Sequence, residues 1–384
     1  MRFSDKNVWQ RIKLNEYADF LQGLTYTPNN VSTTGRLVLR SSNIQNSKLV
    51  FDDNVYVNMN IPAKISTKEN DVLMCVRNGS KNLVGKTALI TKEFENLAWG
   101  AFMNIIRPKD GKTLLFHFLN SQYFKNQIKA DLNTATVNQI TIGTLNQCKI
   151  SIPLSEIEKD KLCIFFNLLD QRIDAQSKII EDLELFKKGI ENQYFSCNKN
   201  NEYVILGDVI TQINNRNEKN IDFEVLSVSN KYGFIPQSEQ FDDHEVASAN
   251  KSNYKIVKQN DFAYNPARIN VGSIAMLRNN QVGIVSPMYI CFRANNNRIL
   301  SSYLDYFSHS NKFNNEVLKN LEGSVRLCLS FESLSKIKIH LPSLDTQYEI
   351  VKNLDLISNK ISIENKILEK LKEQKKYLLS NMFI

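Results

Sequence analysis

The chain has 384 residues, of which 42% are hydrophobic and 23% are charged, and its formal net charge is +8 at pH 7. This length allows two or three domains with cores of their own, and this composition excludes a disordered chain. No run of 18 or more apolar residues and no secretory signal occurs, so we expect a soluble cytoplasmic protein without a membrane span. The positive charge suits a polyanionic partner, but many basic proteins never bind nucleic acid, so charge alone leaves the partner open.

The first segment, residues 1–153, is predicted to be an α+β module. Short β-rich runs such as Arg36–Arg40, Val72–Val76 and Ile105–Ile106 alternate with turn residues. From Leu114 to Ile128, apolar residues recur at helical spacing, which predicts a helix near the end of the module.

The second segment, residues 154–197, is predicted to be one long helix with a narrow apolar stripe. Its heptad a positions are Leu162, Leu169, Gln176, Leu183 and Ile190, and its d positions are Phe166, Ile173, Ile180, Lys187 and Tyr194. A stripe confined to a and d positions is typical of a coiled-coil seam.

The third segment, residues 198–342, repeats the first at an offset of about 190 residues. Lys149–Pro153 matches Lys338–Pro342, and Glu69–Leu73 matches Gln259–Ala263. Runs such as Phe262–Tyr264 and Gly283–Val285 predict strands, and a helix is predicted over Ser302–Leu318.

The fourth segment, residues 343–384, repeats the long helix. Its a positions are Ile350, Ile357, Glu364, Leu371 and Leu378, and its d positions are Leu354, Ile361, Leu368, Lys375 and Met382. Polar residues interrupt both seams at matching places, Gln176 with Glu364 and Lys187 with Lys375. This shared pattern favours a paired coil over two separate amphipathic helices, and we expect Gln176 and Glu364 to meet if the pairing is antiparallel.

Several catalytic motifs are nearly matched and are rejected on spacing. Gly79–Thr87 has one residue too many between its glycines for a phosphate-binding loop. Asn265–Arg268 lacks the second proline and the aromatic residue of an adenine methyltransferase motif, and no glycine-rich cofactor loop occurs. Glu373–Lys375 has a nuclease-like E-x-K spacing but lies on the coil helix. We therefore expect no catalytic residue and no cofactor.

Scattered cysteines and histidines argue against a metal site. None of the six cysteines lies near a histidine at ligand spacing, and there is no C-x-x-C pair. Reduced, mostly buried thiols are therefore expected, and neither disulfides nor zinc.

Polar loops between the strand runs are rich in the residue types that contact DNA in nucleic-acid-binding proteins. Base edges are read by Arg, Lys, Asn and Gln, and phosphates mostly by basic and hydroxyl side chains. In the first module the candidates are Arg40, Asn43, Arg77, Asn78, Lys81, Lys86 and Asn138. In the second module they are Arg216, Lys231, Tyr232, Asn265, Arg268, Asn270 and Arg326. Each could also be a solvated loop residue, and Arg77 and Arg268 are favoured because they occupy matching places in the repeat.

The duplicated order of these stretches resembles the specificity subunits of type I restriction–modification systems. In the second module the resemblance is carried by Asn260–Ile274, Gly323–Glu332 and Ile339–Pro342, and in the helices by the endings Lys187–Phe195 and Lys375–Phe383. The first module departs from the pattern, because its loop Asn78–Lys86 is longer and more basic.

This resemblance implies an α+β fold with a pseudo-twofold internal repeat: two tandem target-recognition domains, joined by two long helices that pair as an antiparallel coiled coil. We expect a central seam formed by Leu169, Ile173, Gln176, Ile180 and Leu183 with Ile357, Ile361, Glu364, Leu368 and Leu371. Each domain would read one half of a bipartite double-stranded DNA site. Two methyltransferase subunits would dock on the helices, and restriction–translocase subunits would join afterwards. The alternative is a coiled-coil scaffold that assembles partners without reading DNA.

Overall fold

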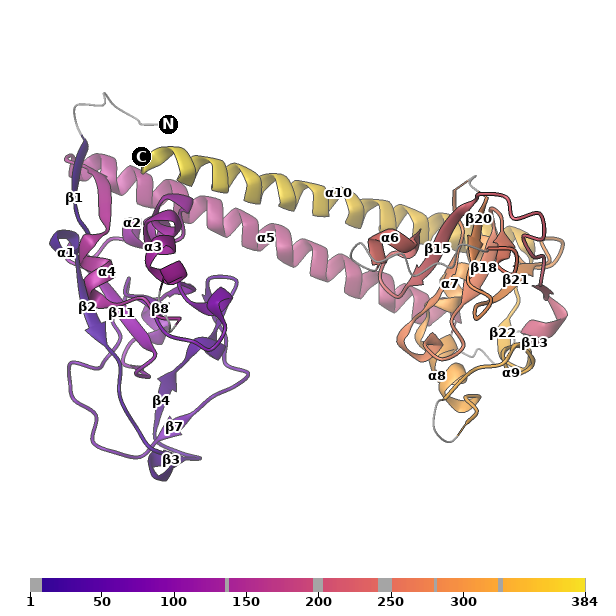
Figure 1. Cartoon of the computed structure of the whole chain (residues 1–384), viewed down its shortest axis with the longest axis horizontal. Helices are drawn as coiled ribbons and strands as arrows, with labels where there is room; N and C mark the ends of the chain where they lie inside the picture. Colours follow the sequence, from indigo (N-terminus) through magenta and orange to yellow (C-terminus); the bar gives the residue numbers. More distant parts are fainter. Residues whose placement is uncertain are drawn as a thin grey trace. The chain divides into compact units, whose positions relative to one another are not determined.

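The computed structural model describes residues 9–134, 138–195, 203–240, 251–279, 282–323 and 327–383. The chain divides into two compact units, one formed by Met1–Ser177 with Lys366–Ile384 and the other by Lys178–Asn365. Both long helices run through both units, so each unit contains one module and a part of each helix (Figure 1). Among the described residues, no helix is long and apolar enough to cross a membrane.

The module of the first unit contains three main sheets and four short helices. A two-stranded ribbon pairs β1 (Trp9–Lys13) with β12 (Lys149–Pro153). A four-stranded sheet has the order β2 (Ala18–Gln22), β11 (Met103–Pro108), β8 (Val72–Cys75), β9 (Thr87–Leu89). A second four-stranded sheet has the order β10 (Ala98–Trp99), β4 (Arg36–Leu39), β7 (Tyr56–Val57), β3 (Val31–Ser32). The strands β5 (Ile44–Gln45) and β6 (Lys48–Leu49) form a small separate pair. The helices are α1 (Leu14–Tyr17), α2 (Leu114–Leu119), α3 (Gln122–Thr134) and α4 (Ile142–Gln147).

The module of the second unit repeats this plan. Its ribbon pairs β13 (Tyr203–Ile205) with β22 (Lys338–His340). The other strands form a sheet in the order β14 (Ile210–Ile213), β21 (Ile290–Ala294), β18 (Asp261–Tyr264), β19 (Ile274–Met276) and a sheet in the order β16 (Gly233–Pro236), β15 (Glu224–Ser229), β20 (Gly283–Val285), β17 (Lys255–Val257). The helices are α6 (Gln237–Gln240), α7 (Ser301–Ser308), α8 (Asn311–Lys319) and α9 (Phe331–Ser335).

The strand order confirms the internal repeat that the sequence predicts. The sheet β2-β11-β8-β9 corresponds strand for strand to β14-β21-β18-β19, and all its pairs are antiparallel in both modules. In each remaining four-stranded sheet one pair is parallel, β4 with β10 in the first module and β15 with β20 in the second. The two modules are therefore copies of one α+β fold.

An ion pair on a buried aspartate occupies the same point of both copies. Arg107 donates two hydrogen bonds to Asp71, both 2.7 Å long, and Arg293 donates two to Asp261, 2.6 and 3.0 Å long. Each carboxylate also accepts a backbone N–H, from Lys68 and from its counterpart in the second module. A bidentate arginine–aspartate pair fixes the orientation of the two chain segments relative to one another as well as their separation.

Each module has two consecutive helices where the sequence predicts one. The expected helix Leu114–Ile128 is divided into α2 and α3, and Ser302–Leu318 is divided into α7 and α8. A serine causes both breaks. The hydroxyls of Ser121 and Ser310 each accept the backbone N–H three residues ahead, so each serine begins a new helix.

The long helices are α5 (Glu156–Phe195) and α10 (Leu344–Met382). In the first unit, Leu162 and Phe166 near the start of α5 share a core with Leu379 and Phe383 at the end of the chain. In the second unit, Phe195 at the end of α5 shares a core with Ile350, Val351 and Leu354 near the start of α10. The two helices therefore pair antiparallel, as predicted.

Burial along both helices follows the predicted seam. Every predicted a and d position is buried or half-buried, polar positions included, whereas neighbours such as Ile164, Leu168 and Leu356 are exposed. The coiled coil is thereby confirmed. Gln176 and Glu364 are both buried, but they belong to different units, so their meeting stays a prediction.

The two lysines at matching seam positions lie where each module joins the coil. In the first unit, Lys375 forms an ion pair with Asp170, beside the buried His117, whose ring lies 3.3 Å from the Asn167 side chain. In the second unit, Tyr306 replaces the histidine.

Tyr306 makes the equivalent contacts in its own unit. Its hydroxyl donates to Asp355 at 2.6 Å, and the ammonium group of Lys187 lies 5.4 Å from the centre of its ring. Lys375 is thus tolerated in the seam because α5 supplies a carboxylate for it, and Lys187 because the adjacent module supplies an aromatic face.

His117 makes the joint of the first unit sensitive to acid. Burial, and secondarily the charge of Lys375, lower the pKa of His117 to about 3. Below about pH 6.5 the unfolded chain binds a proton at this residue that the folded chain does not, so stability falls as the pH falls from about 6.5 toward 3. We expect His117→Phe to flatten the pH dependence of the free energy of unfolding between pH 6.5 and 4, by up to about 1.4 kcal/mol per pH unit. Urea titrations at several pH values measure this slope, and parallel curves for the two proteins would contradict it.

Candidate nucleic-acid interface

Three connections of the first module meet at one place. The loop Arg40–Asn43 follows β4, the loop Arg77–Lys86 follows β8, and Asn138 precedes α4. Asn78 joins them: its side chain donates to the hydroxyl of Ser41 at 3.1 Å, and its backbone N–H donates to the carbonyl of Asn138 at 3.3 Å. The amide of Asn138 in turn donates to the carbonyl of Gly79 at 3.0 Å.

The basic candidates of this module surround that meeting point. Arg77, Lys81 and Lys86 are exposed, and the guanidinium carbon of Arg77 lies 5.2 Å from the centre of the Phe102 ring. Arg40 is half-buried and forms an ion pair with Asp53 at 2.7 Å. Three cationic side chains are therefore presented to solvent from one loop.

Asn43 has a different role from its neighbours. It is fully buried, its side-chain oxygen accepts the N–H of Arg40, and its amide donates to the carbonyls of Val50 and Asp53. A side chain without exposed surface contacts no ligand in this arrangement. Asn43 shapes the loop that presents Arg40, and we leave it out of the interface as a contact.

The same three connections meet in the second module. The loop after β15 and the loop after β18 both line a pocket of about 340 Å³, to which they contribute Ser229, Asn230, Asn265 and Arg268. The N–H of Leu329, in the connection before α9, donates to the carbonyl of Pro266 at 3.0 Å. The repeat therefore brings equivalent loops together in both modules.

The remaining candidates of the second module are distributed around these loops. Arg268 and Asn270 are exposed, whereas Asn265 is half-buried and accepts the N–H of Ala267. Lys231 and Tyr232 form the exposed tip of the hairpin between β15 and β16. Arg216 donates to the side chain of Asn253 at 3.2 Å, apart from the loop after β18. Arg326 lies outside the described residues.

A glycine with positive φ closes the loop after β8 in the first module and the loop after β18 in the second. Gly85 (φ +87°) and Gly272 (φ +88°) precede β9 and β19, and this left-handed backbone is strained for any other residue. The loops differ in length: Cys75 pairs with Lys86 across ten residues, and Asn265 pairs with Ser273 across seven. The strand β9 also follows Lys86 directly, where a phosphate-binding loop would require a helix.

Phe102 also lies at this surface, although nothing in the sequence around it marks it as a candidate contact. Phe102 lies in the turn before β11, and its carbonyl accepts the N–H groups of Val76 and Arg77. Its side chain is 57% exposed although it is fully apolar. Only the strand pairing reveals that it lies beside Arg77, because the two are 25 residues apart in the sequence.

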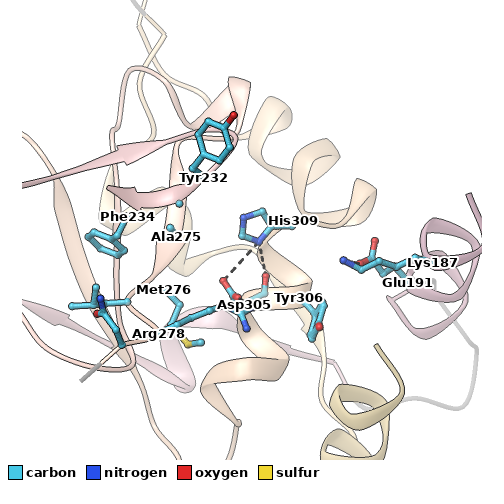
Figure 2. A pocket seen from close by; sticks show the side chains of 13 residues that line it. Lys187, Glu191, Tyr232, Phe234, Ala275, Met276, Arg278, Asp305, Tyr306 and His309 are labelled. Atoms are coloured by element: carbon cyan, nitrogen blue, oxygen red, sulfur yellow. Dashed lines mark hydrogen bonds and ion pairs between the residues drawn. The ribbon is translucent and has the colours of Figure 1, made fainter. Parts of the chain in front are cut away.

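A second pocket, of about 440 Å³, lies between the module of the second unit and α5 (Figure 2). Tyr232 lines it from the hairpin tip, and Lys187 and Glu191 line it from α5. His309 Nδ1 lies 2.8 Å from the carbonyl of Asp305, so the ring is held by its own helix. Burial raises the pKa of Glu191. The pocket belongs to the joint with the coil and not to the meeting loops.

The described part of the chain contains no group of three His, Cys, Asp or Glu side chains that could hold a metal ion. Among the described cysteines, Cys75, Cys163, Cys291 and Cys328 are free thiols, and burial raises the pKa of Cys75, Cys163 and Cys291. Thiols of this kind are unreactive, because the thiolate is the nucleophile and the metal ligand.

Removing the Asn78 side chain should loosen the meeting loops. Asn78→Ala removes the hydrogen bond to Ser41. It also removes the side-chain oxygen that accepts the backbone N–H of Ser80 at 3.0 Å. We expect amide hydrogen exchange over residues 78–83 to accelerate, because local opening becomes less costly. Asn82→Ala, in the same loop and exposed, is the matched control. Equal exchange in the two variants would contradict the role assigned to Asn78.

Comparison with known proteins agrees with this architecture. Residues 7–185 and 198–373 match the family described as the type I restriction modification DNA specificity domain. The chain is 22% identical to the type I restriction enzyme StySPI specificity subunit of Salmonella potsdam, over 90% of this chain and 81% of that protein. It is 23% identical to a putative type I restriction enzyme MjaX specificity subunit of Methanocaldococcus jannaschii, over 97% and 92%.

Solved structures share the fold. The chain resembles the type I restriction–modification S subunit from M. genitalium with a TM-score of 0.57, at 15% identity over 99% of this chain and 97% of that one. A structure described as concerning complex assembly and conformational transition of the type I R-M system gives a TM-score of 0.61, at 15% identity over 98% of both chains. With the family matched over both modules and most of both helices, the chain belongs to the type I restriction modification DNA specificity family and is a specificity subunit of a type I restriction–modification system.

Proposed function

We propose that this chain reads a bipartite double-stranded DNA site, with one module on each half. The observation that carries the proposal is the repeated meeting of three polar loops, with an exposed arginine in each module, Arg77 in the first and Arg268 in the second. Arginine binds guanine with two hydrogen bonds in the major groove, and asparagine does the same with adenine. Because the loops differ in length and residues, the two half-sites differ in sequence.

The other polar residues of these loops divide into two roles in this proposal. Lys81, Lys86 and Lys231 are exposed ammonium groups at loop and hairpin tips and suit the phosphate backbone. Asn78 and Asn138 hold the loops together and offer their remaining hydrogen-bonding capacity to bases. Arg40, Arg216 and Asn270 lie at the margins, and Tyr232 suits stacking or sugar contact.

We propose further that the outer faces of α5 and α10 bind two methyltransferase subunits. Ile157, Ile164 and Leu168 are exposed along one side of α5, and Leu356 and Ile363 are exposed on α10. Exposed apolar residues at helical spacing are typical of a surface that is covered in an assembly. In such a complex, located in the cytoplasm, the partners carry out the catalysis and this chain contributes specificity alone. The partners include restriction–translocase subunits where these join.

The proposal also includes the domain boundaries, which are placed at residues 153, 197 and 342.

A scaffold that assembles partners without contacting DNA is the competing function. It would account for the coil and its exposed apolar side chains. It gives no reason for the arginine-bearing loops to meet at equivalent places in both modules, so the reading function is favoured.

Substituting each arginine should affect one half of the site. We expect Arg77→Ala to weaken binding by about 1–3 kcal/mol and to relax preference in one half-site, and Arg268→Ala to do the same in the other. Affinity for wild-type and altered sites, measured with the methyltransferase partner present, tests this. Arg298→Ala is the control. Arg298 is exposed and follows the end of β21, whereas the loop of Arg268 lies beside the start of that strand, where Tyr264 pairs with Ile290. A uniform loss over all sequences with a shallower salt dependence would make either arginine a phosphate contact.

The division of labour predicts that the chain alone is catalytically silent. Incubated with S-adenosylmethionine and DNA, the purified chain should transfer no methyl group, whereas the same chain with its methyltransferase partner should methylate one bipartite site. Radiolabel transfer measures both. Methylation by the chain alone would contradict the absence of an active site.

A further inference from the structure

The exposed ring of Phe102 stands beside the arginine of the first reading loop. Its carbonyl accepts the N–H of Val76 at 3.0 Å and the N–H of Arg77 at 3.2 Å, so the turn that bears the ring is fixed to the start of the loop. The guanidinium carbon of Arg77 lies 5.2 Å from the ring centre. The ring and the guanidinium group therefore form one surface, half apolar and half cationic.

The partner of such a surface must offer an apolar group next to hydrogen-bond acceptors. In the major groove of DNA, the 5-methyl group of thymine is the apolar group on a base edge, and phenylalanine is among the residues that contact it. The acceptors O6 and N7 of guanine suit the arginine beside it. Insertion between bases fits less well, because a wedge needs both ring faces, and the guanidinium group of Arg77 already occupies one.

The second module has a similar pair at the same place. Asp71 and Asp261 are equivalent, and the residues three positions later, Met74 and Tyr264, pair with Asn104 and Ile290. Two residues before these partners stand Phe102 and Met288. Met288 is 61% exposed and lines the pocket to which Arg268 contributes. An exposed apolar side chain beside the arginine is therefore a feature of both copies.

We propose that Phe102 reads the 5-methyl group of a thymine adjacent to the base pair that Arg77 contacts, so that the half-site of the first module contains a thymine next to a guanine. The proposal rests on the proposed DNA-reading function and adds a specificity residue to it.

The first experiment uses the chain together with its methyltransferase partner and a library of randomised double-stranded DNA. Sequences bound by the wild type, Phe102→Ala, Phe102→Leu and Val31→Ala are compared; Val31 is an exposed apolar residue on β3 of the same module. We expect Phe102→Ala to lose the preference for thymine at one position while the second half-site stays unchanged. Phe102→Leu keeps an apolar side chain and should retain part of the preference, and Val31→Ala should select the wild-type sequence.

The second experiment removes only the methyl group. Deoxyuridine replaces thymine at the position that Phe102→Ala no longer reads, and the dissociation constants are measured for both proteins. We expect about a fourfold weakening for the wild type, the factor that corresponds to about 0.8 kcal/mol for one buried methyl group, and no change for Phe102→Ala.

The outcomes separate the inference from the function on which it rests. If the wild type selects no sequence, the proposed function fails and this inference fails with it. If Phe102→Ala selects the wild-type sequence, loses the whole first half-site, or responds to deoxyuridine as the wild type does, DNA reading stands and the methyl contact is refuted. A rise in 2-aminopurine fluorescence on binding, absent in Phe102→Ala, would place the ring between bases and overturn the methyl contact as well.

Discussion

The core of each module is completed by the end of a long helix. Phe383, second from the end of the chain, is fully buried against Phe118 of the first module, with ring centres 5.4 Å apart. Phe195, at the end of α5, is buried against Tyr303 and Phe307 of the second module. Burying an aromatic side chain is among the largest single contributions to a core. Neither module can therefore bury its apolar surface without both long helices, which makes the coil part of the fold and not an appendage.

This dependence explains the polar residues in the seam. A lysine at a d position ordinarily weakens a coiled coil. Here Lys375 and Lys187 lie where the seam meets a module, and each finds a partner there, Asp170 in one unit and the ring of Tyr306 in the other. The joint is thus a three-way contact among α5, α10 and a module. Tyr306 stands in the second module where the first has His117. Both are aromatic rings with a polar atom directed at a long helix, His117 at Asn167 of α5 and Tyr306 at Asp355 of α10.

The long-period features could be predicted from the sequence and the short-range ones could not. The repeat, the seam and its polar interruptions were readable because periodicity survives without knowledge of contacts. The break at Ser121 was missed because a hydroxyl that caps a helix gives the same pattern as one on its surface. Composition marks Asn43 as a candidate contact, whereas in the structure it is buried and braces its own loop, because composition cannot distinguish an asparagine that supports a loop from one on its surface. Phe102 was invisible because its position beside Arg77 depends on strand pairing alone.

The two modules have kept their framework and changed their loops, and the physics of each part explains the difference. The bonds of Arg107 to Asp71 and of Arg293 to Asp261 recur because both aspartates are buried, and removing the arginine would leave a buried carboxylate without a compensating charge. Apart from Val76, Val84 and Ile269, the side chains between β8 and Gly85 and between β18 and Gly272 are exposed or half-buried, so most loop positions carry no such constraint. Loops held on a rigid framework can therefore vary in length and sequence without loss of stability. A duplicated framework with unlike loops is the arrangement that the proposed reading of two different half-sites requires.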